Sequence, residues 1–513
     1  MRLSVLMVVL TLLVVSVVSA QDSFTSLDGR FSFTVPSGWE VEESVGFIIL
    51  SDDDRNELFL GMLNSNDIEL AREYYADTLD SEFTADTLFQ LLADATPEIN
   101  ANIEAELGVS FALPGTTYEG PVEIAGYTGA AGAFGMTPVI VLEAETGDFL
   151  VFRLEGEEGA FDTMLESLLS TLVISPFSFD AATYTTPITA ETAPDVTLVT
   201  QYNFSSGTTH DVKFLPDGQS FVVLAGGRVQ HIDLATADVI KIFDAGAGLV
   251  RTMDISSDGS LVAGALIFRD DPDVTFLRIW DAATGEELNT IMTNSDSDHP
   301  ELVRFSPDGS LVGVVADGLF IHEVATGDEF LVIDTEREAV TFNGDGTRLA
   351  ATCPERPGKL ICIYDVASGE VLTEILNPDR IFPIGYRSLA SAGDHFLVGF
   401  SQNNDLAPMI AFSWETGEVV FTAEGIADDS GRTNHEDEVG WIALDTDESL
   451  AVTIGGEDAF RLWDAATGAG LSVQPDAHGF SIVNRAAISP DGTLLFTTAN
   501  DGTVRVWAVE SGS

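Results

Sequence analysis

An Asp-Gly pair recurs through the C-terminal part of this 513-residue chain, each time after an apolar segment. The examples are LPDG (215–218), SSDG (256–259), SPDG (306–309), NGDG (343–346) and SPDG (489–492). Asp and Gly accept the positive φ angles of a hairpin turn, so each pair predicts a turn between two strands. The first four glycines are 41, 50 and 37 residues apart (218 to 259 to 309 to 346), which indicates a repeat array.

A second element follows these turns: a strand that ends in an aromatic and an acidic residue and then turns on Thr-Gly or Ser-Gly. Examples are RIWDAATG (278–285), CIYDVASG (362–369) and RLWDAATG (461–468). Repeats of about 45 residues with four short strands are typical of β-propeller blades. We count seven blades, which begin near His210, Val250, Glu301, Glu338, Ile381, Val439 and Asn484.

The seventh blade has three predicted strands, whereas each of the others has four. Residues 196–202 (VTLVTQY) precede the first blade and have no partner of their own. We predict that they pair with the strand around Thr503–Val509 and close the ring. Closure removes the exposed strand edges at which sheets otherwise associate.

Residues 195–513 therefore resemble the WD-repeat β-propeller family. In that family a polar network links a His before the first strand, a Ser or Thr on the second, an Asp in the next turn and the Trp that ends the third. Blade six has matching residues at His435, Thr453, Trp463 and either Glu457 or Asp458. Blade seven has Thr497, Asp501 and Trp507, with His478 about one residue out of place. The other blades mostly lack the set, which favours a divergent bacterial propeller.

Residues 21–177 follow a different pattern, and they predict a small α+β domain. Phe31, Phe33 and Val35 alternate with polar residues, as in a strand with one buried face. Helical spacing begins at Ile68 and resumes at Leu88, after a predicted cap at Thr84. A closing helix carries its apolar residues on one face, namely Phe161, Leu165, Leu168, Leu169 and Leu172.

The stretch SLDGRFSFTVPSGWEVEE (26–43), together with this element order, resembles the PsbP-like α+β family. The resemblance implies a binding or assembly module outside the cytoplasm and brings no catalytic residues with it. Residues 178–194 are rich in Thr, Ala and Pro and lack periodicity. They predict an extended linker between the two domains.

The chain begins with Arg2 and an apolar run that ends in the small residues before Gln21. This pattern predicts a signal peptide over residues 1–20, cleaved after Ala20. The alternative is a retained membrane anchor, although the run is slightly short to span a bilayer. We expect a secreted or cell-envelope protein that has no stable membrane span after cleavage.

The two cysteines, Cys353 and Cys362, flank a predicted hairpin. If Pro357 and Gly358 form the centre of its turn, the cysteines lie directly opposite each other. An oxidising compartment then allows a disulfide between them. Two buried free thiols are the alternative interpretation.

The charge of the chain limits its partners. Acidic residues number 83 and basic residues 22, so the formal net charge is −61, and only Lys213, Lys241 and Lys359 are lysines. Nucleic acids and anionic membranes need clustered Lys and Arg, so the composition argues against both. A hydrophobic content of 45% excludes a merely disordered acidic chain.

Catalytic and metal-binding motifs are absent from the sequence. Four histidines precede first strands, where a metal cluster is one interpretation: His210, His299, His435 and His478. Structural histidines of the repeat are favoured, because no two stand at ligand spacing. Acidic clusters such as Asp270–Asp273 do not match a calcium loop. We therefore predict no cofactor, no metal ion and no catalytic residue.

These patterns favour an exported, non-catalytic binding or scaffold protein whose propeller loops contact a protein partner. The candidate loops are Phe268–Val274, Thr293–Pro300 and Ala423–Glu438. Because these loops are acidic, they favour a basic or cationic partner. The alternative is a propeller enzyme, either a quinoprotein-type oxidoreductase or a lactonase-like hydrolase, because the D-x-x-T-G turns also resemble those of quinoprotein dehydrogenases.

The excess of carboxylates predicts that salt stabilises the fold, because screening reduces their mutual repulsion. We expect the melting temperature of the full chain to rise as sodium chloride is added. Thermal unfolding at several chloride concentrations and constant pH measures this. A melting temperature that does not change with salt contradicts the prediction.

Overall fold

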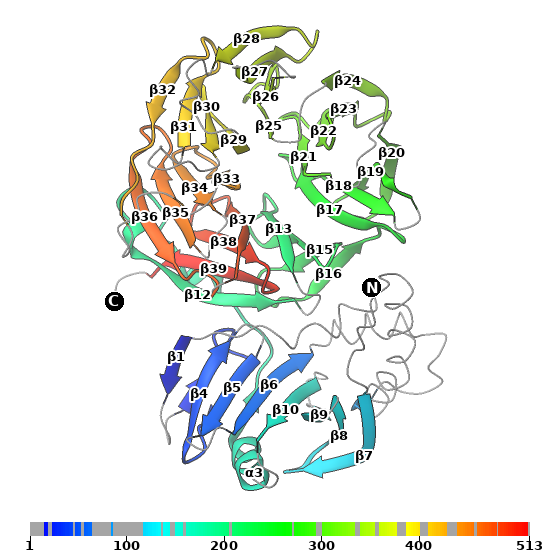
Figure 1. The fold of residues 1–513 in the computed structure, drawn as a ribbon, viewed down its shortest axis with the longest axis vertical. Coiled ribbons are helices and arrows are strands. Elements are labelled where there is room, and N and C mark those ends of the chain that lie inside the picture. Colours follow the sequence, from blue (N-terminus) through cyan, green and yellow to red (C-terminus); the bar gives the residue numbers. More distant parts are fainter. Residues whose placement is uncertain are drawn as a thin grey trace. The chain divides into compact units, whose positions relative to one another are not determined.

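The structure is a computed structural model. It describes residues 15–18, 23–44, 47–52, 56–63, 84–85, 116–134, 137–143, 149–156, 161–204, 208–268, 271–293, 300–333, 339–353, 359–376, 386–400, 409–427, 435, 439–455, 459–479 and 481–510. The chain forms two compact units. The first is Met1–Ser178 with Ser205–Gly207, and the second is Phe179–Phe204 with Thr208–Ser513. Each unit is described by itself (Figure 1).

An eight-stranded antiparallel sheet dominates the described part of the first unit, in the order β1-β4-β5-β6-β10-β9-β8-β7. Its strands are β1 (Val15–Val18), β4 (Trp39–Ser44), β5 (Phe47–Asp52), β6 (Glu57–Leu63), β7 (Thr116–Ile124), β8 (Tyr127–Phe134), β9 (Thr137–Glu143) and β10 (Phe149–Glu155). A smaller sheet, β11-β3-β2, and one helix complete it. These elements are β2 (Ser23–Thr25), β3 (Phe31–Thr34), β11 (Val173–Ile174) and α3 (Asp162–Thr171).

The core of this unit confirms two features expected from the sequence. Phe31 and Phe33 on β3, and Val35 just after it, are buried. The expected closing helix is α3, which buries Leu165 and Leu168 in the same hydrophobic cluster. A period of two on the strand and of 3.6 on the helix thus places both apolar faces in one core.

The described part does not show the small α+β domain that the sequence predicted. Long antiparallel strands bury most of its apolar residues, and α3 is its one multi-residue helix. The helices expected around Ile68 and Leu88 lie outside the described residues. Strand β1 lies within the predicted signal peptide and pairs with β4, whereas the predicted cleavage site after Ala20 is outside the described residues.

The described part of the second unit contains seven four-stranded antiparallel sheets (Figure 1). The first three are β13 (Thr209–Phe214), β14 (Ser220–Ala225), β15 (Arg228–Asp233) and β16 (Val239–Phe243); β17 (Leu249–Ile255), β18 (Leu261–Phe268), β19 (Asp271–Asp281) and β20 (Glu287–Met292); and β21 (Leu302–Phe305), β22 (Leu311–Val315), β23 (Leu319–Glu323) and β24 (Glu329–Ile333). The next three are β25 (Val340–Phe342), β26 (Arg348–Thr352), β27 (Lys359–Asp365) and β28 (Val371–Leu376); β29 (Tyr386–Ala392), β30 (His395–Phe400), β31 (Met409–Ser413) and β32 (Val419–Thr422); and β33 (Trp441–Leu444), β34 (Leu450–Ile454), β35 (Ala459–Asp464) and β36 (Gly470–Pro475). The seventh joins β12 (Val196–Asn203) to β37 (Val483–Ile488), β38 (Leu494–Ala499) and β39 (Thr503–Val509).

The innermost strands of consecutive sheets contact one another around the ring, and β37 returns to β13. Strand β12 pairs with β39 in antiparallel register, from Val196 opposite Val509 to Asn203 opposite Thr503. The seventh sheet is thus built from two segments at opposite ends of the array. The pairing expected between residues 196–202 and this strand is confirmed, and the seven sheets form a closed propeller.

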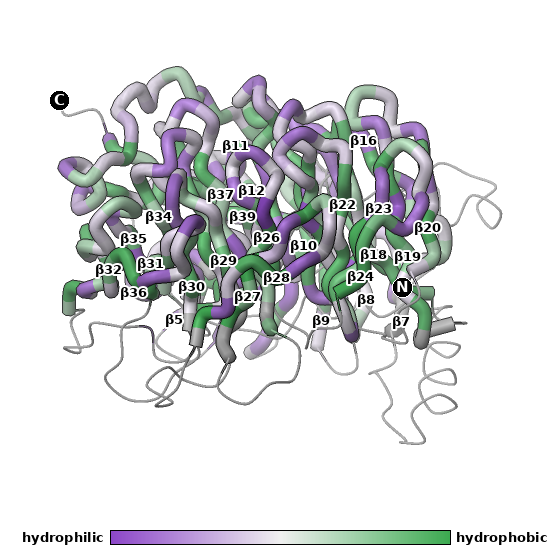
Figure 2. Tube along the Cα trace, turned by 90° about the horizontal axis from the view of Figure 1, so that it is seen from above, coloured by the Kyte–Doolittle hydropathy of each residue, from purple (hydrophilic) through white to green (hydrophobic). Residues whose placement is uncertain are grey.

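The outermost strands expose large apolar side chains in five blades. Two exposed residues occur on each of β16, β20, β24, β28 and β32: Ile240 and Ile242, Leu288 and Met292, Phe330 and Val332, Val371 and Leu372, and Val419 and Val420. Figure 2 shows hydrophobic stretches along β24 and β28. Each of these outer strands therefore presents apolar side chains to solvent.

The Asp-Gly turns differ from the expected hairpin geometry, in which both residues have positive φ. At the second turn only Gly259 has a positive φ, of 71°. The Asp258 carboxylate instead accepts hydrogen bonds from Ser256 Oγ (2.7 Å) and the Ser260 backbone N–H (2.9 Å). Ser256 Oγ in turn accepts from the Leu261 N–H (2.9 Å). The Ser-x-Asp-Gly sequence thus supplies side-chain partners for the turn backbone.

Residues 178–194 are not the extended linker that the sequence predicted. They contain the short helical turns η1 (Ala181–Thr183) and η2 (Ala193–Asp195). The Phe179 N–H donates to the Ala235 carbonyl (2.9 Å), and the Ile188 N–H donates to the Gly492 carbonyl (2.8 Å). The segment therefore bonds to turns of the first and seventh blades, which satisfies backbone groups that a free linker leaves to water.

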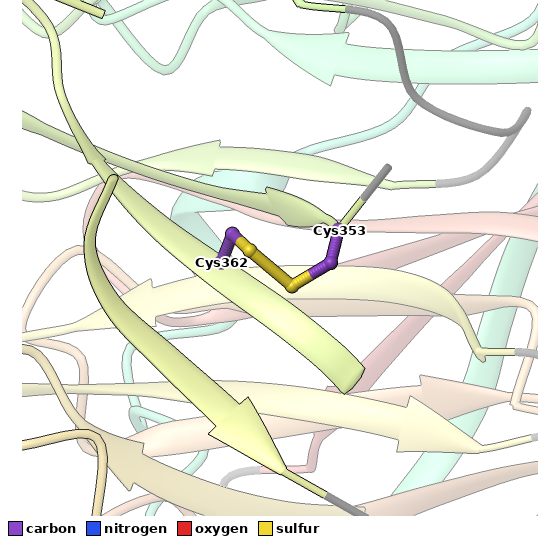
Figure 3. The surroundings of a disulfide bond; sticks show 2 residues. All are labelled: Cys353 and Cys362. Atoms are coloured by element: carbon purple, nitrogen blue, oxygen red, sulfur yellow. A yellow bond between two sulfur atoms is a disulfide. The ribbon is translucent and has the colours of Figure 1, made fainter. Parts of the chain in front are cut away.

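Cys353 and Cys362 are joined by a disulfide, with their Cα atoms 5.0 Å apart (Figure 3). Ala351, rather than Cys353, lies opposite Cys362 in the pairing of β26 with β27. The predicted register was therefore wrong by two residues. Cys353 lies diagonal to Cys362, on the same side as Ala351, because alternate residues share a face. The intervening residues 354–358 lie outside the described residues.

Hydrogen bonds lower the pKa of the turn aspartates Asp258, Asp308 and Asp345. At Asp308 the donors are Ser306 Oγ first and then the backbone and side chain of Ser310. In the unfolded chain an aspartate has a pKa of about 3.9. A carboxyl group whose pKa is lower than this in the folded state stabilises the fold at pH values above the unfolded-state pKa. That stability is lost as the pH falls through the folded-state pKa. We expect Asp308→Asn to lower the free energy of unfolding at pH 7 by on the order of 0.5 kcal/mol, because solvent screens this exposed site. The variant should also lose less stability on acidification.

Urea unfolding at neutral and acidic pH measures both effects. Asp328→Asn is the matched control, because Asp328 is also exposed and lies in a neighbouring turn. Equal losses in the two variants at pH 7 contradict the role assigned to the Asp308 carboxylate.

Candidate binding site on the propeller axis

The indole ring of Trp441 meets three basic side chains on the axis of the propeller. The distances to its centroid are 5.2 Å from Lys213 Nζ, 5.3 Å from Arg304 Cζ and 4.4 Å from Arg485 Cζ. These residues belong to β33, β13, β21 and β37, the inner strands of blades six, one, three and seven. Blades three and six are not neighbours in the ring, so the contacts cross its axis. Cations at these distances are attracted to the face of an indole.

Two carboxylates accompany these cations. Asp254 Oδ1 lies 3.4 Å from Lys213 Nζ and 4.0 Å from Arg304 Nη1. Asp211 is buried and accepts a hydrogen bond from the Val212 backbone N–H (2.9 Å). We call the following residues the axial cluster: Asp211, Lys213, Asp254, Arg304, Trp441 and Arg485. Three positive charges face two negative ones in this cluster, whereas the whole chain has a net charge of −61.

The charges of the axial cluster are only partly compensated. Burial raises the pKa of Asp211, against the lowering influence of Lys213 and Arg485. Burial also lowers the pKa of the Arg485 guanidinium, and the nearby positive charge of Arg304 lowers it further, whereas Asp211 raises it. The raised pKa of Asp211 and the lowered pKa of Arg485 both indicate that the surrounding protein does not fully replace the hydration of these two groups in water.

Three donors in or beside the axial cluster have no hydrogen-bond partner within the described part of the chain. They are Nε of Arg304, Nε of Arg485 and the hydroxyl of Thr252. Thr252 is 3% exposed and precedes Asp254 by two residues on β17, so both lie on the same face of that strand. A buried donor without a partner costs about 1–3 kcal/mol, so such atoms need an explanation.

Solvent reaches the axial cluster, because the side chains of Lys213 and Arg304 are each 21% exposed. His210 and Arg251 lie near it, on the exposed parts of β13 and β17. Partial burial lowers the pKa of His210, and the positive charges of Arg251 and Arg485 lower it further. Basic side chains therefore lie near the N-terminal ends of the inner strands β13 and β17, as well as in the axial cluster.

The structure brings together the polar network predicted in blade seven. His478 Nε2 and Trp507 Nε1 lie 2.8 and 2.9 Å from Thr497 Oγ1, and His478 Nδ1 lies 2.8 Å from Asp501 Oδ2. Burial alone raises the pKa of Asp501, but His478 and the hydrogen bonds from Thr503 hold it below its usual value. The one-residue offset of His478 in the sequence does not prevent these contacts.

Blade six has a similar arrangement. His435 Nε2 lies 2.8 Å from Thr453 Oγ1, and Trp463 Nε1 donates to the same oxygen at 2.7 Å. The acidic candidates, Glu457 and Asp458, lie outside the described residues. In both His435 and His478, the Nε2 atom contacts a threonine hydroxyl. These contacts support a structural role for the two histidines.

No metal centre is found among the described residues. No group of three or more His, Cys, Asp or Glu side chains there is arranged to hold a metal ion. His299 lies outside the described part. Within the part searched, no helix is long and apolar enough to cross a membrane.

Two of the candidate binding loops lie mainly outside the described residues, at 294–299, 428–434 and 436–438. The third, Phe268–Val274, is not a long loop, because Phe268 ends β18 and β19 begins at Asp271. The axial cluster was not among the predicted sites. A signal for it was present, because Lys213, Asp254 and Arg304 each stand five residues before the glycine of an Asp-Gly turn. Charged residues at one repeated strand position must meet around the ring axis.

Comparison with known proteins supports a class for the fold of the second unit. Residues 472–508, which include β37, β38 and most of β39, match the family model described as WD domain, G-beta repeat. Together with the seven blades and the His-Thr-Trp networks, this match supports a WD-repeat β-propeller for the array. The comparisons do not support the PsbP-like resemblance of the N-terminal region.

Three relatives are transducin beta-like protein 3 from mammals. The Bos taurus protein is 29% identical over 176 residues, which cover 34% of this chain and 20% of that protein. The Rattus norvegicus protein is 29% identical over 170 residues, covering 33% and 19% of the two chains. The Mus musculus protein is 30% identical over 158 residues, covering 30% and 18%. The chain thus spans about a fifth of the length of these curated relatives.

These relatives correct the expected location of the protein. The sequence predicted a secreted or cell-envelope protein of bacterial type, from its apolar N-terminus and the PsbP-like resemblance. The relatives are instead transducin beta-like protein 3 of cattle, rat and mouse.

The network in blade seven predicts a large effect of one isosteric substitution. Thr497→Val removes the oxygen that accepts from Trp507 and contacts His478, and leaves both buried partners unsatisfied. We expect the free energy of unfolding to fall by about 2–4 kcal/mol. Thr197→Val is the control, because Thr197 is exposed on β12 of the same blade. Urea unfolding of both variants measures the difference, and equal stabilities contradict the structural role.

Proposed function

We propose that the protein is a non-catalytic scaffold that binds a protein partner at the end of the propeller where the inner strands begin. The observation that carries the proposal is the closed WD-repeat ring with a basic and aromatic cluster on its axis. Closure holds the inner strands in fixed positions, so side chains from four blades form one preformed surface. A preformed surface reduces the ordering cost of binding.

The composition of the site supports recognition of a protein. Trp and Arg are the residue types most enriched where protein interfaces gain their binding energy. Trp441, Arg304 and Arg485 combine both types at one place, and exposed Arg251 and His210 lie beside them. The exposed residues therefore supply a rim around a partly buried centre.

A catalytic role has less support in the structure. The enzyme alternatives require a cofactor-binding cysteine pair or a reactive constellation. The two cysteines are joined to each other on blade four, and the axial cluster has no hydroxyl or thiol nucleophile activated by a base. We therefore propose binding, rather than chemistry, as the role of the axis.

Site-specific photo-crosslinking tests this function. A photoreactive amino acid is placed in the full chain at His210, at Arg251 and, as a control, at Leu288 on outer strand β20. We expect one and the same protein to be cross-linked from His210 and Arg251, and to be absent from the Leu288 sample. Mass spectrometry of the adducts identifies it. Adducts that are equal at all three positions, or absent from both sites on the inner strands, contradict the proposal.

A further inference from the structure

We propose that the axial cluster binds an oxyanion, a carboxylate or a phosphate, carried by a side chain of a peptide partner. The proposal deepens the proposed function, since it names the chemical group that enters the site. It rests on three observations: a local excess of positive charge, donors without partners, and solvent access to a site on the axis. Each is independent of the loops outside the described residues.

Charge is the first observation. Lys213, Arg304 and Arg485 converge on one indole ring, while the axial cluster contains only two carboxylates, Asp211 and Asp254. The rest of the chain is strongly acidic, so basic residues are scarce. A site that gathers three of them has an electrostatic potential unlike that of the surrounding surface, which favours an anion.

Hydrogen-bonding capacity is the second observation. Nε of Arg304 and Nε of Arg485 have no acceptor among the described residues, and neither has the hydroxyl of buried Thr252. An oxyanion has several lone pairs and accepts from guanidinium groups in charge-assisted bonds. One such group can therefore satisfy donors that the protein leaves without acceptors.

Access and selectivity are the third observation. Lys213 and Arg304 keep 21% of their side-chain surface exposed, so a side chain can reach them from solvent. Trp441 is only 5% exposed and covers the cations from one side. Because the face of an indole repels negative charge, the anion must approach from the side of the nitrogen donors. A lysine or arginine of a partner meets like charges at the same place and is disfavoured.

Free anions test the site without any protein partner. We expect inorganic phosphate to raise the melting temperature of the full chain above that in sodium chloride of equal ionic strength, because a ligand that binds the folded state stabilises it. Acetate tests the carboxylate in the same way. Lys213→Gln should abolish the extra stabilisation, whereas Lys241→Gln should retain it. Lys241 is the matched control, because it lies on outer strand β16 and its loss changes the net charge equally.

Peptides distinguish the two sources of the oxyanion. A fluorescein-labelled Gly-Ser peptide with one central glutamate is compared with versions that carry phosphoserine or lysine there, by fluorescence anisotropy. We expect the wild-type protein to bind the glutamate or the phosphoserine peptide and not to bind the lysine peptide. Arg304→Gln should bind the same peptide at least about tenfold more weakly. Arg278→Gln is the control, since Arg278 pairs with Glu287 outside the axial cluster.

Three outcomes overturn the proposal: a phosphate response that is equal in wild type, Lys213→Gln and Lys241→Gln; no response to either anion in wild type; or equal binding of the lysine peptide. If Lys213→Gln does not fold, Arg304→Gln replaces it in the thermal experiment. A selective anion response without any cross-linked protein leaves the oxyanion site supported and refutes the scaffold function. The two proposals can therefore fail separately.

Discussion

The hydrogen-bonded pairing of β12 with β39 is the interaction on which the propeller depends. Without it the seventh sheet lacks its outer strand, and the first and seventh blades are not tied together by the chain. The inner strands β37 and β13 meet only in a closed ring. Closure therefore also fixes the distances between side chains that cross the axis, including those around Trp441.

The axial cluster shows how an acidic protein can create a local site of opposite charge. With 83 acidic and 22 basic residues, most surfaces of such a chain repel anions. Lys213 and Arg304 lie in a confined place, where the Trp441 ring and Asp254 partly replace water. The replacement is incomplete, as the raised pKa of Asp211 indicates. The electrostatic potential of such a site differs from that of the surrounding surface for two reasons: the site is positive, and the surroundings are negative.

The repeat spacing was enough to predict the seven blades and the closing strand, because turn residues and apolar alternation are local and periodic signals. It did not predict the packing of residues 178–194, whose contacts with Ala235 and Gly492 are distant in sequence. The register at Cys353 was missed because it rested on a turn assumed at Pro357 and Gly358, whereas Ala351 is the residue that lies opposite Cys362. The axial cluster was missed because its members are single residues on separate strands, and only the ring brings them together.

Closure by β12 also affects the order in which the protein can be completed. Thr197 and Ala508 are 311 residues apart in sequence, yet they lie opposite each other in one sheet. On the ribosome, β12 emerges long before its partner, so the first six blades can form while the seventh cannot. Until β39 is synthesised, the unpaired edge of β12 needs temporary protection from other chains. The rate at which the last blade is translated should therefore influence how much of the protein reaches its native state.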